Sequence, residues 1–142
     1  MFSFFPVFAW YIQDGYPDQQ IRIGFLRDPA DSDLSDGICI ACNRNEETEE
    51  IKDQGFKTEY RLRIDFTYTI QVFSRNDEAE CNEISTEFLE LLPPGEDIHI
   101  SYDGSTYNMY INKINDKVEY RESTNFWLET LTFTGFTYEK II

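Results

Sequence analysis

Residues 60–72 decide the fold, and they read Tyr60-Arg61-Leu62-Arg63-Ile64-Asp65-Phe66-Thr67-Tyr68-Thr69-Ile70-Gln71-Val72. Every second residue of this stretch is apolar or aromatic, and the residues between them are polar or charged. Successive side chains of a strand point to opposite faces, so this alternation predicts a strand with one buried face and one hydrated face. Burial of only one face is typical of an antiparallel sheet.

A charged segment precedes this strand. Residues 43–55 read Asn-Arg-Asn-Glu-Glu-Thr-Glu-Glu-Ile-Lys-Asp-Gln-Gly, which a hydrophobic core cannot use, so we expect them to protrude. A strand over residues 56–73 would be about 60 Å long at ~3.3 Å per residue, which exceeds the width of a small domain. We therefore expect the excess to pair with residues 38–44 as a β-hairpin arm that carries the acidic segment at its tip.

The N-terminal third is predicted to begin with a helix and to continue with short strands. Residues 4–14 can form the helix, because Pro6 is tolerated in a first turn and Gly15 follows the last one. After the helix come two short strands and an acidic loop between them, expected at residues 20–26, 38–41 and 28–36.

A second helix and an antiparallel meander are predicted after the central strand. Asp77 and the residues before it open the helix in the manner of a capping box, and Pro93-Pro94-Gly95 ends it. One helical face is apolar and comprises Cys81, Ile84, Phe88, Leu91 and Leu92. Further strands are expected at residues 98–102, 106–114, 118–122 and 126–138, with turns at Asp103-Gly104 and Asn115-Asp116.

These elements indicate an α+β fold of mostly antiparallel β-sheet, with helices packed on one face and a protruding β-hairpin arm. The 142 residues suffice for one hydrophobic core, so we expect a single domain over residues 1–142 with the arm near residues 43–55. Aromatic residues make up 16% of the chain, which excludes an intrinsically disordered polymer.

The chain is strongly acidic, with 27 Asp and Glu against 12 Lys and Arg and a formal net charge of −15. A field of that sign repels phosphate groups, which argues against tight nucleic-acid binding and against binding to anionic membranes. No apolar run is long enough to span a bilayer. The apolar start lacks the basic flank and cleavage site of a signal peptide, so we expect a docked N-terminal segment.

Cysteine and histidine offer candidate redox and zinc sites. Cys39 and Cys42 form a CxxC pair, which a redox site places at a turn between a strand and a helix. Here the pair lies in an expected strand, where the sulfurs would point to opposite faces, so we interpret both as small buried residues. A Cys3His zinc site could add Cys81 and His99, but these two lack the close spacing of a second ligand pair. The odd number of cysteines favours free thiols in a reducing compartment.

The acidic loop is a candidate cation site, and the single histidine is a candidate catalytic residue. Residues 31–37 resemble a calcium loop in composition, but the sixth and twelfth EF-hand positions hold Asp36 and Cys42 instead of Gly and Glu. A weak cation site of another kind stays open, beside a solvated loop whose carboxylates accept from turn amides. His99 is the only histidine, and no nucleotide-binding or nucleophile motif is present, so we expect neither catalysis nor a cofactor.

Two groups of residues are candidates for contacts with a partner. The first is the charged segment, which is either a solvated tip or a projection that meets a partner. The second is the N-terminal aromatic group, which is either core or an exposed docking patch, with Phe8 and Trp10 expected in the core. The candidate interface residues are Phe2, Phe4, Phe5, Glu46, Glu47, Glu49, Glu50 and Lys52.

The order of these elements resembles the tail terminator, or tail-completion, proteins of long-tailed bacteriophages. The similarity rests on the leading helix at residues 5–13, the strand at residues 20–26, the charged arm, and residues 66–92, which run through Val-Phe-Ser-Arg-Asn-Asp into the second helix. The closing strands at residues 98–138 complete the pattern. The charged segment and the aromatic N-terminus depart from it.

The resemblance implies a virion subunit that forms a hexameric ring and is assembled in the host cytoplasm. The ring would cap the tail tube, stop its polymerisation and bind the head-completion or connector protein. DNA would pass through it without tight or sequence-specific binding, and no membrane would be involved. Another neck component, such as a head-closure or connector subunit, is the alternative in the same context. A soluble ligand- or metal-binding module is the alternative from a different class.

Overall fold

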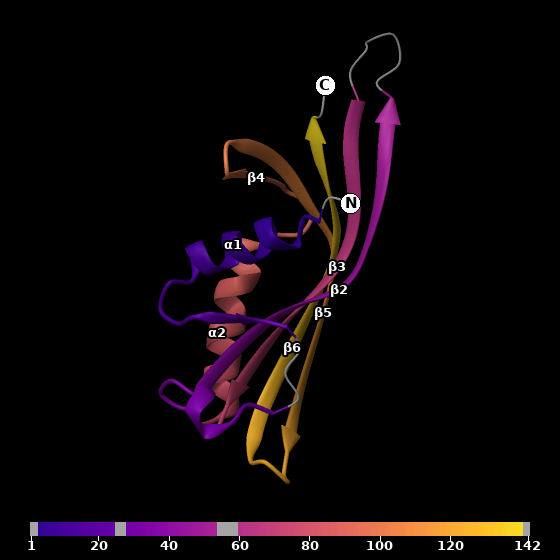
Figure 1. Ribbon diagram of the computed structural model, residues 1–142. Helices are drawn as coiled ribbons and strands as arrows, with labels where there is room; N and C mark the ends of the chain where they lie inside the picture. The colour runs from indigo at the N-terminus through magenta and orange to yellow at the C-terminus, as the bar shows by residue number, and fades with distance from the viewer. Residues whose placement is uncertain (1–2, 25–27, 54–59, 141–142) are drawn as a thin grey trace.

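A computed structural model describes residues 3–24, 28–53 and 60–140 of the chain (Figure 1). Four of its strands are long, with 15 to 17 residues each, and they give the sheet its height. In chain order the elements are α1 (Phe5–Gly15), β1 (Ile21–Ile23), the 3-10 helix η1 (Asp31–Asp33), β2 (Ile38–Asp53), β3 (Tyr60–Ser74), α2 (Glu78–Leu91), β4 (Asp97–Tyr102), β5 (Ser105–Arg121) and β6 (Phe126–Lys140).

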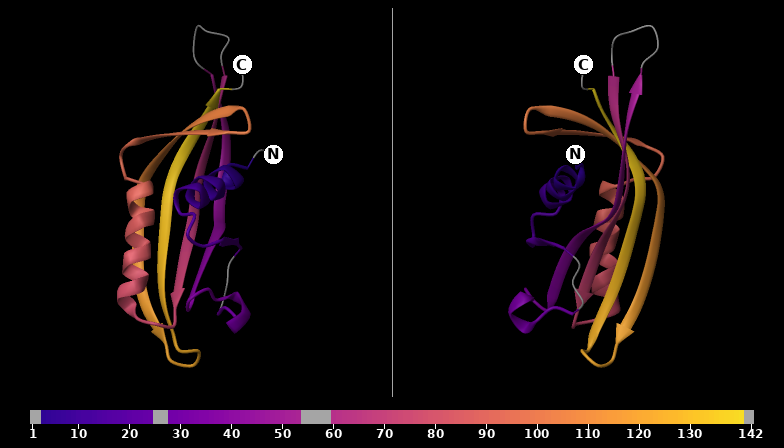
Figure 2. Two further views of the ribbon diagram at one scale, coloured as in Figure 1. Left: turned by 90° about the vertical axis from the view of Figure 1, so that its left-hand side faces the viewer. Right: turned by 45° about the vertical axis from the view of Figure 1, so that its right-hand side comes forward.

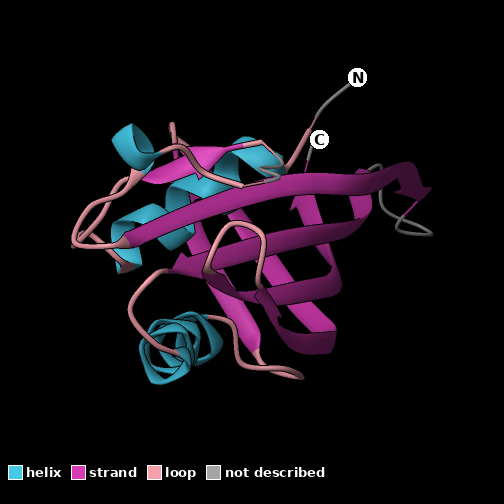
Figure 3. Ribbon diagram, turned by 90° about the horizontal axis from the view of Figure 1, so that it is seen from below, coloured by secondary structure: helices cyan, strands magenta, loops and turns pink. Residues whose placement is uncertain are grey.

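The strands form one sheet in the order β1-β2-β3-β6-β5-β4. β1 runs parallel to β2, and all other neighbours in the sheet are antiparallel. In the described chain both α-helices lie on the same face of the sheet, and the other face carries none (Figures 1 and 2). Figure 3 shows the sheet from below, where it is curved. This arrangement confirms the predicted α+β fold.

The alternating apolar residues of β3 from Ile64 to Val72 face the two helices, as their pattern predicts. Aromatic rings dominate this core, and Phe66 lies among them, with ring centroids 4.4 Å from Tyr68, 5.7 Å from Phe4 and 6.1 Å from Phe8. Close packing of such rings is a major source of stability in a small domain. The residues of β3 that are at most 2% exposed on this face are Ile64, Phe66, Tyr68, Ile70 and Val72.

Each helix begins within a few residues of its predicted start. α1 has Pro6 in its first turn, where a missing N–H costs nothing, and it buries Phe8 against the sheet. α2 is capped by Asp77, whose carboxylate accepts a 2.8 Å hydrogen bond from the backbone N–H of Glu80. Neither of these described helices is long and apolar enough to cross a lipid bilayer. The predicted apolar face of α2 contributes the buried residues Cys81, Ile84 and Phe88.

The opposite face of β3 is not hydrated along its whole length, so that prediction is wrong in part. Thr69 is 4% exposed and Gln71 is 1% exposed, because β3 is central and the side chains of its neighbouring strands shield it on both sides. The Thr69 hydroxyl donates a 2.8 Å hydrogen bond to the side-chain oxygen of Asn45. A second small core also lies on this face and consists of Cys39, Phe73, Phe126 and Leu128, with Leu34 packed against it.

The charged segment, predicted at the tip of a β-hairpin arm, largely forms one of the paired strands of that arm. Residues 43–53 continue β2, and the register with β3 runs to Asp53 opposite Tyr60, with one bulge at Asn45. Backbone pairing does not require apolar side chains, so a charged stretch can follow its neighbour while its side chains stay in water. The arm is a ribbon of β2 and β3 that extends beyond the helices (Figure 1), and residues 54–59 lie outside the described residues.

The turn predicted at Asn115-Asp116 does not exist. Both residues lie within β5, where Asn115 pairs with Thr132 and Asp116 pairs with Leu131 of β6. The long ladder between β5 and β6 satisfies the backbone groups that a turn would otherwise satisfy locally, so tertiary pairing overrides the turn preference of these residue types. The two strands predicted on either side of the turn are therefore one strand, which has a bulge at Asn112.

Candidate functional site: the free edges and open face of the sheet

The outermost strands of the sheet are short and leave part of their neighbours uncovered. β1 pairs only with residues 40–42 of β2, and β4 pairs only with residues 105–110 of β5. Among the described strands, none pairs with the outer side of β2 from Asn43 onward or of β5 from Asn112 onward. Uncovered edges offer backbone N–H and C=O groups to another strand.

The uncovered edge of β2 is acidic. Glu46, Thr48, Glu49 and Glu50 are all exposed. The register with β3 places Glu46, Thr48 and Glu50 on the open face of the sheet and Glu49 on the helix-covered side. Three of the predicted interface residues are therefore accessible, and their contact with a partner stays a prediction. The side chain of Lys52 lies outside the described part of the chain.

Glu47 differs from its neighbours because its side chain is only 3% exposed. Its carboxylate lies at the N-terminus of α1, where it accepts hydrogen bonds from the Ser3 hydroxyl at 2.7 Å and from the Phe4 backbone N–H at 3.1 Å. Helix N-termini carry unpaired N–H groups and a partial positive charge, so a carboxylate there is stabilising. Burial and then the charge of Glu47 raise the pKa of Tyr68. Glu47 thus joins the arm to the first helix of the same subunit.

The N-terminal aromatic residues divide between core and surface. Phe4 is fully buried in the main core, Phe5 is half-buried, and Phe2 lies outside the described residues. Trp10, expected in the core, is 41% exposed and lies on α1 with its ring centroid 5.6 Å from that of Tyr102 in β4. The expectation for Trp10 is wrong because a helix that lies on a sheet buries only one of its sides.

The uncovered edge of β5 carries two lysines. Lys113 and Lys117 are exposed, four residues apart, with the exposed Asn115 between them. All three lie on the open face, since they pair with Thr134, Thr132 and Thr130 of β6. A hollow of about 340 Å³ on this face is lined in part by Asn115 and Lys117. The edge therefore presents positive charge, in contrast to the edge of β2.

The open face between the two edges is polar. Arg63 lies at its upper end, pairs with Asp65 at 2.9 Å, donates to the Tyr138 hydroxyl at 3.0 Å and lies 4.1 Å from the centroid of Phe136. The contacts with Tyr138 and Phe136 run from β3 to β6, and such cross-strand contacts order this face, which neither described α-helix covers. The centre of the face is a patch of threonines from β3 and β6, namely Thr67, Thr69, Thr130, Thr132 and Thr134.

The acidic loop at residues 28–36 is held by arginines. Three of its carboxylates form ion pairs, and these pairs hold the loop at the lower end of the sheet, where Leu34 packs on the small core. Asp31 and Asp33, two of the carboxylates considered for cation binding, thus have counter-ions from the protein itself. The pairs are Asp28 with Arg121 at 2.8 Å, Asp33 with Arg22 at 3.3 Å, and Asp31 with Arg75.

The three cysteines are buried and lie apart from the single histidine. Cys42 belongs to the main core and Cys39 to the small core on the other face, which confirms that the CxxC side chains point to opposite faces. Burial raises the pKa of Cys81 to about 12, so this thiol stays protonated at neutral pH. His99 is exposed on β4, 3.4 Å from Asp97. The described residues contain no cluster of three or more metal-ligating side chains.

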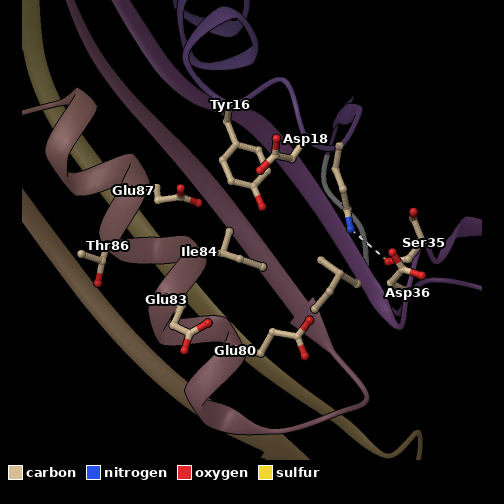
Figure 4. A pocket seen from close by; sticks show the side chains of 11 residues that line it. Tyr16, Asp18, Ser35, Asp36, Glu80, Glu83, Ile84, Thr86 and Glu87 are labelled. Atoms are coloured by element: carbon tan, nitrogen blue, oxygen red, sulfur yellow. Dashed lines mark hydrogen bonds between the residues drawn. The ribbon is translucent and has the colours of Figure 1, made fainter.

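An acidic hollow lies between α2, the segment after α1 and the segment before β2 (Figure 4). Its volume is about 580 Å³. Burial and then the charges of Glu87 and Asp18 raise the pKa of Tyr16, which lines it. This hollow could not be predicted from the sequence, because its acidic residues come from three separate segments. They are Asp18, Asp36, Glu80, Glu83 and Glu87.

Glu129 is a buried carboxyl that the sequence analysis also missed. It lies on the helix-covered face of β6 and is 2% exposed. Its pKa is raised to about 7, first by burial and then by the neighbouring Asp116. A contact with Ser85 of α2 lowers the pKa by a smaller amount. The nearest residues of β6 on this face, Trp127, Leu131 and Phe133, are apolar, so the alternation in the sequence could have indicated the buried position of Glu129. Its charged neighbour Asp116 could not have been predicted in this way.

Comparison with solved structures gives a likeness that extends along the chain. The fold is similar to that of a chain from the virion of a native gene transfer agent particle, with a TM-score of 0.55. The match covers 97% of this chain and 99% of that chain, at 13% sequence identity, and at this identity the likeness shows a shared fold. No protein-family model and no curated protein matches the sequence.

Proposed function

We propose that this chain is a structural subunit of a phage-like virion and that it acts there as a tail terminator. The observation that carries the proposal is the likeness of its fold, over 97% of the chain, to a chain from the virion of a gene transfer agent particle. The order of elements supports the finer assignment, because it resembles the tail terminator proteins. In this role the subunits form a ring of six that caps the tail tube, ends its polymerisation and binds the head connector.

The architecture suits a protein that works by assembly. The sheet has an uncovered edge on each side, and a contact between two different edges, repeated by rotation, closes into a ring. Exposed charged residues are present on both of these edges and on the outer side of α2, and such positions can meet other proteins without disturbing the core. Capping and joining need no bond to be made or broken, so the proposed role is non-enzymatic.

The charge of the subunit suits a channel for DNA. α2 contains five glutamates and no basic residue. Six copies at −15 each would give the ring a formal charge of −90. A field of this sign repels the phosphate backbone, so DNA would pass through the ring without being held. The partners of the ring would be the tail tube protein and the head connector protein.

Removal of the gene from a particle-producing strain tests this function. We expect tubes of uncontrolled length and heads without attached tails in electron micrographs, and we expect the unaltered gene, supplied in trans, to restore normal particles. Tails of normal length that join heads would contradict the proposal. Tails of normal length that fail to join, together with copurification of the chain with heads, would favour a head-closure subunit instead.

A further inference from the structure

The two uncovered edges match each other in direction, charge and length. We propose that β2 of one subunit adds to β5 of the next as an antiparallel ladder, with Glu46 opposite Lys117 and Glu50 opposite Lys113. The occupant of each edge is thus a second copy of this chain. This proposal deepens the proposed function and rests on it in one respect, namely that copies of the chain assemble with one another. The evidence for this particular pairing comes from the register of the sheet.

Strand direction makes the pairing antiparallel. β2 runs antiparallel to β3, β3 to β6, and β6 to β5, so β2 and β5 of one subunit run in opposite directions. Subunits related by rotation about a ring axis keep the same direction along that axis. β2 of one copy and β5 of the next therefore meet antiparallel, which is the arrangement that these strands already have with their neighbours inside the sheet.

The side chains on the open face match at one register. Glu46, Thr48 and Glu50 lie on this face of β2, and Lys113, Asn115 and Lys117 lie on this face of β5. The two glutamates are four residues apart, as are the two lysines. An antiparallel register with Thr48 opposite Asn115 therefore sets both glutamates opposite lysines at once. Opposite charges in directly paired positions stabilise a ladder, and like charges destabilise it.

The same charges disfavour the competing symmetric dimers. Two β2 edges would bring glutamates together, and two β5 edges would bring lysines together. On the helix-covered side the proposed register sets Glu47 opposite Asp116, which is a pair of like charges. The carboxylate of Glu47, however, is turned to the N-terminus of α1 by the Phe4 N–H and the Ser3 hydroxyl. The contact between different edges is the one that allows a ring to grow and close.

Within its own subunit, each edge is covered up to a definite residue, and the uncovered part begins just after it. The carbonyl of Cys42 accepts a hydrogen bond from Gly24 at 2.8 Å, and the carbonyl of Ile111 accepts one from Gly95 at 3.0 Å. The uncovered lengths therefore begin at Asn43 on β2 and at Asn112 on β5. The proposed register sets residues 43–51 against residues 112–120, so it covers most of both lengths without displacing either short edge strand.

The register predicts a strand tilt that a closed ring requires. Inside one sheet Glu46 is level with Lys113, through Thr67 and Thr134. Pairing Glu46 with Lys117 of the next copy shifts that copy along the strand direction by four residues, or ~13 Å. This shift accumulates across one subunit and its contact with the next, which is four strand spacings of ~4.8 Å each. The strands then tilt by about 35° from the ring axis, which is within the range of about 35–45° found in closed barrels.

Cysteine cross-linking tests the register. The variant T48C/N115C cannot link within one subunit, because the two positions are three strand spacings apart, or ~14 Å. Under mild oxidation we expect a ladder of disulfide-linked oligomers on non-reducing gels, in the purified chain and in particles that contain it. The native cysteines are buried and do not interfere. The control T48C/E119C moves one thiol by four residues and should give only monomer.

Absence of cross-linked oligomers from T48C/N115C in both samples would overturn the proposal, and equal cross-linking of the control would overturn the register. The test also separates this proposal from the proposed function. Cross-links in a chain whose removal leaves tail length normal would keep the edge pairing and reject the function. If removal of the chain gave tails of uncontrolled length but the variant formed no cross-links, the function would be kept and the edge pairing rejected.

Charge reversal tests the matched pairs. We expect E46K/E50K and K113E/K117E, introduced separately into the T48C/N115C chain, each to reduce oligomer yield by about tenfold or more. A mixture of the two should recover most of the yield, because each variant then offers the edge that the other lacks. The control E83K/E90K changes the same number of glutamates on α2 and should leave the yield unchanged. Full yield in either single variant, or no recovery in the mixture, would overturn the charge pairing.

Discussion

The two faces of the sheet are ordered in different ways. On the helix-covered face, burial orders the side chains, and rings such as Phe66 and Phe8 pack against one another. On the open face, cross-strand contacts such as that between Arg63 of β3 and Tyr138 of β6 do so, and no helix covers them in the described chain. β3 supplies both faces through alternate residues. The covered face therefore determines whether the subunit folds, whereas the open face can determine how subunits meet.

The largest expected effect comes from a charge placed on the covered face. Phe66→Asp puts an unpaired carboxylate among aromatic rings at a position that is 2% exposed. We expect it to destabilise the fold by more than ~4 kcal/mol and to leave the subunit unfolded. Thr67→Asp places the same charge one residue later, on the open face, and should melt within a few degrees of the parent chain. Circular dichroism melts of the two variants measure the difference, and a normally melting Phe66→Asp would show that the faces are assigned in reverse.

Gly135 provides a milder way to break the covered face. A Cβ atom at this position would lie 2.1 Å from the backbone oxygen of Tyr110 and 3.1 Å from the ring of Phe66. The strand would have to move, because backbone atoms cannot rotate away as a flexible side chain can, so Gly135→Ala should cost about 3 kcal/mol. Thr134→Ala, on the open face, is the matched control. Urea unfolding midpoints should fall for Gly135→Ala, and an equal midpoint in both variants would contradict this packing.

Glu129 should make the covered face sensitive to pH. Its pKa is about 7 in the folded chain, above its ordinary value of 4.5, because the ionised form is buried near Asp116. The unfolded chain loses this proton at lower pH than the folded chain does, so stability should fall as the pH rises from about 4.5 to about 7.

Glu129→Gln removes this dependence. We expect the variant to match the parent near pH 4.5 and to exceed it by about 3 kcal/mol at pH 8, since about 1.4 kcal/mol accompanies each unit of pKa. Glu122→Gln changes an exposed glutamate and should keep the pH profile of the parent. Thermal melts across this range measure the effect, and parallel profiles for parent and Glu129→Gln would show that the buried carboxyl does not titrate in the folded chain.

Much of the covered face could be predicted from the sequence, because its signals are local. The alternation in residues 60–72 fixed which residues of β3 meet the helices, and Asp77 with the proline pair after α2 marked the ends of that helix. The extent of β2 could not be predicted, because its charged residues are held by backbone pairing with β3. The continuity of β5 was hidden by the turn preference of Asn115-Asp116, which pairing with β6 overrides.

The uncovered edges could not be predicted for a different reason. They exist because β1 and β4 are short and lie outermost, and strand order is a property of the whole chain. Even so, Glu46 and Glu50, which are interface candidates by sequence, lie on one of the two edges. Glu47 belongs to the same charged run, yet its partners are Ser3 and Phe4, more than forty residues away.

Substitution of Glu47 gives the smallest predicted change in stability. It also tests most closely the difference between residues that stabilise the subunit and residues that are available for contacts with another copy. Glu47→Ala removes the acceptor at the start of α1 and leaves the Phe4 N–H without its partner, which should cost about 1 kcal/mol. Glu49→Ala, two residues along on the same side of β2 but exposed, should leave the melting temperature unchanged. Equal melting temperatures would place Glu47 with the assembly residues. A lower value for Glu47→Ala alone would show that one acidic run contains a residue that stabilises the subunit beside residues that remain available to a neighbouring copy.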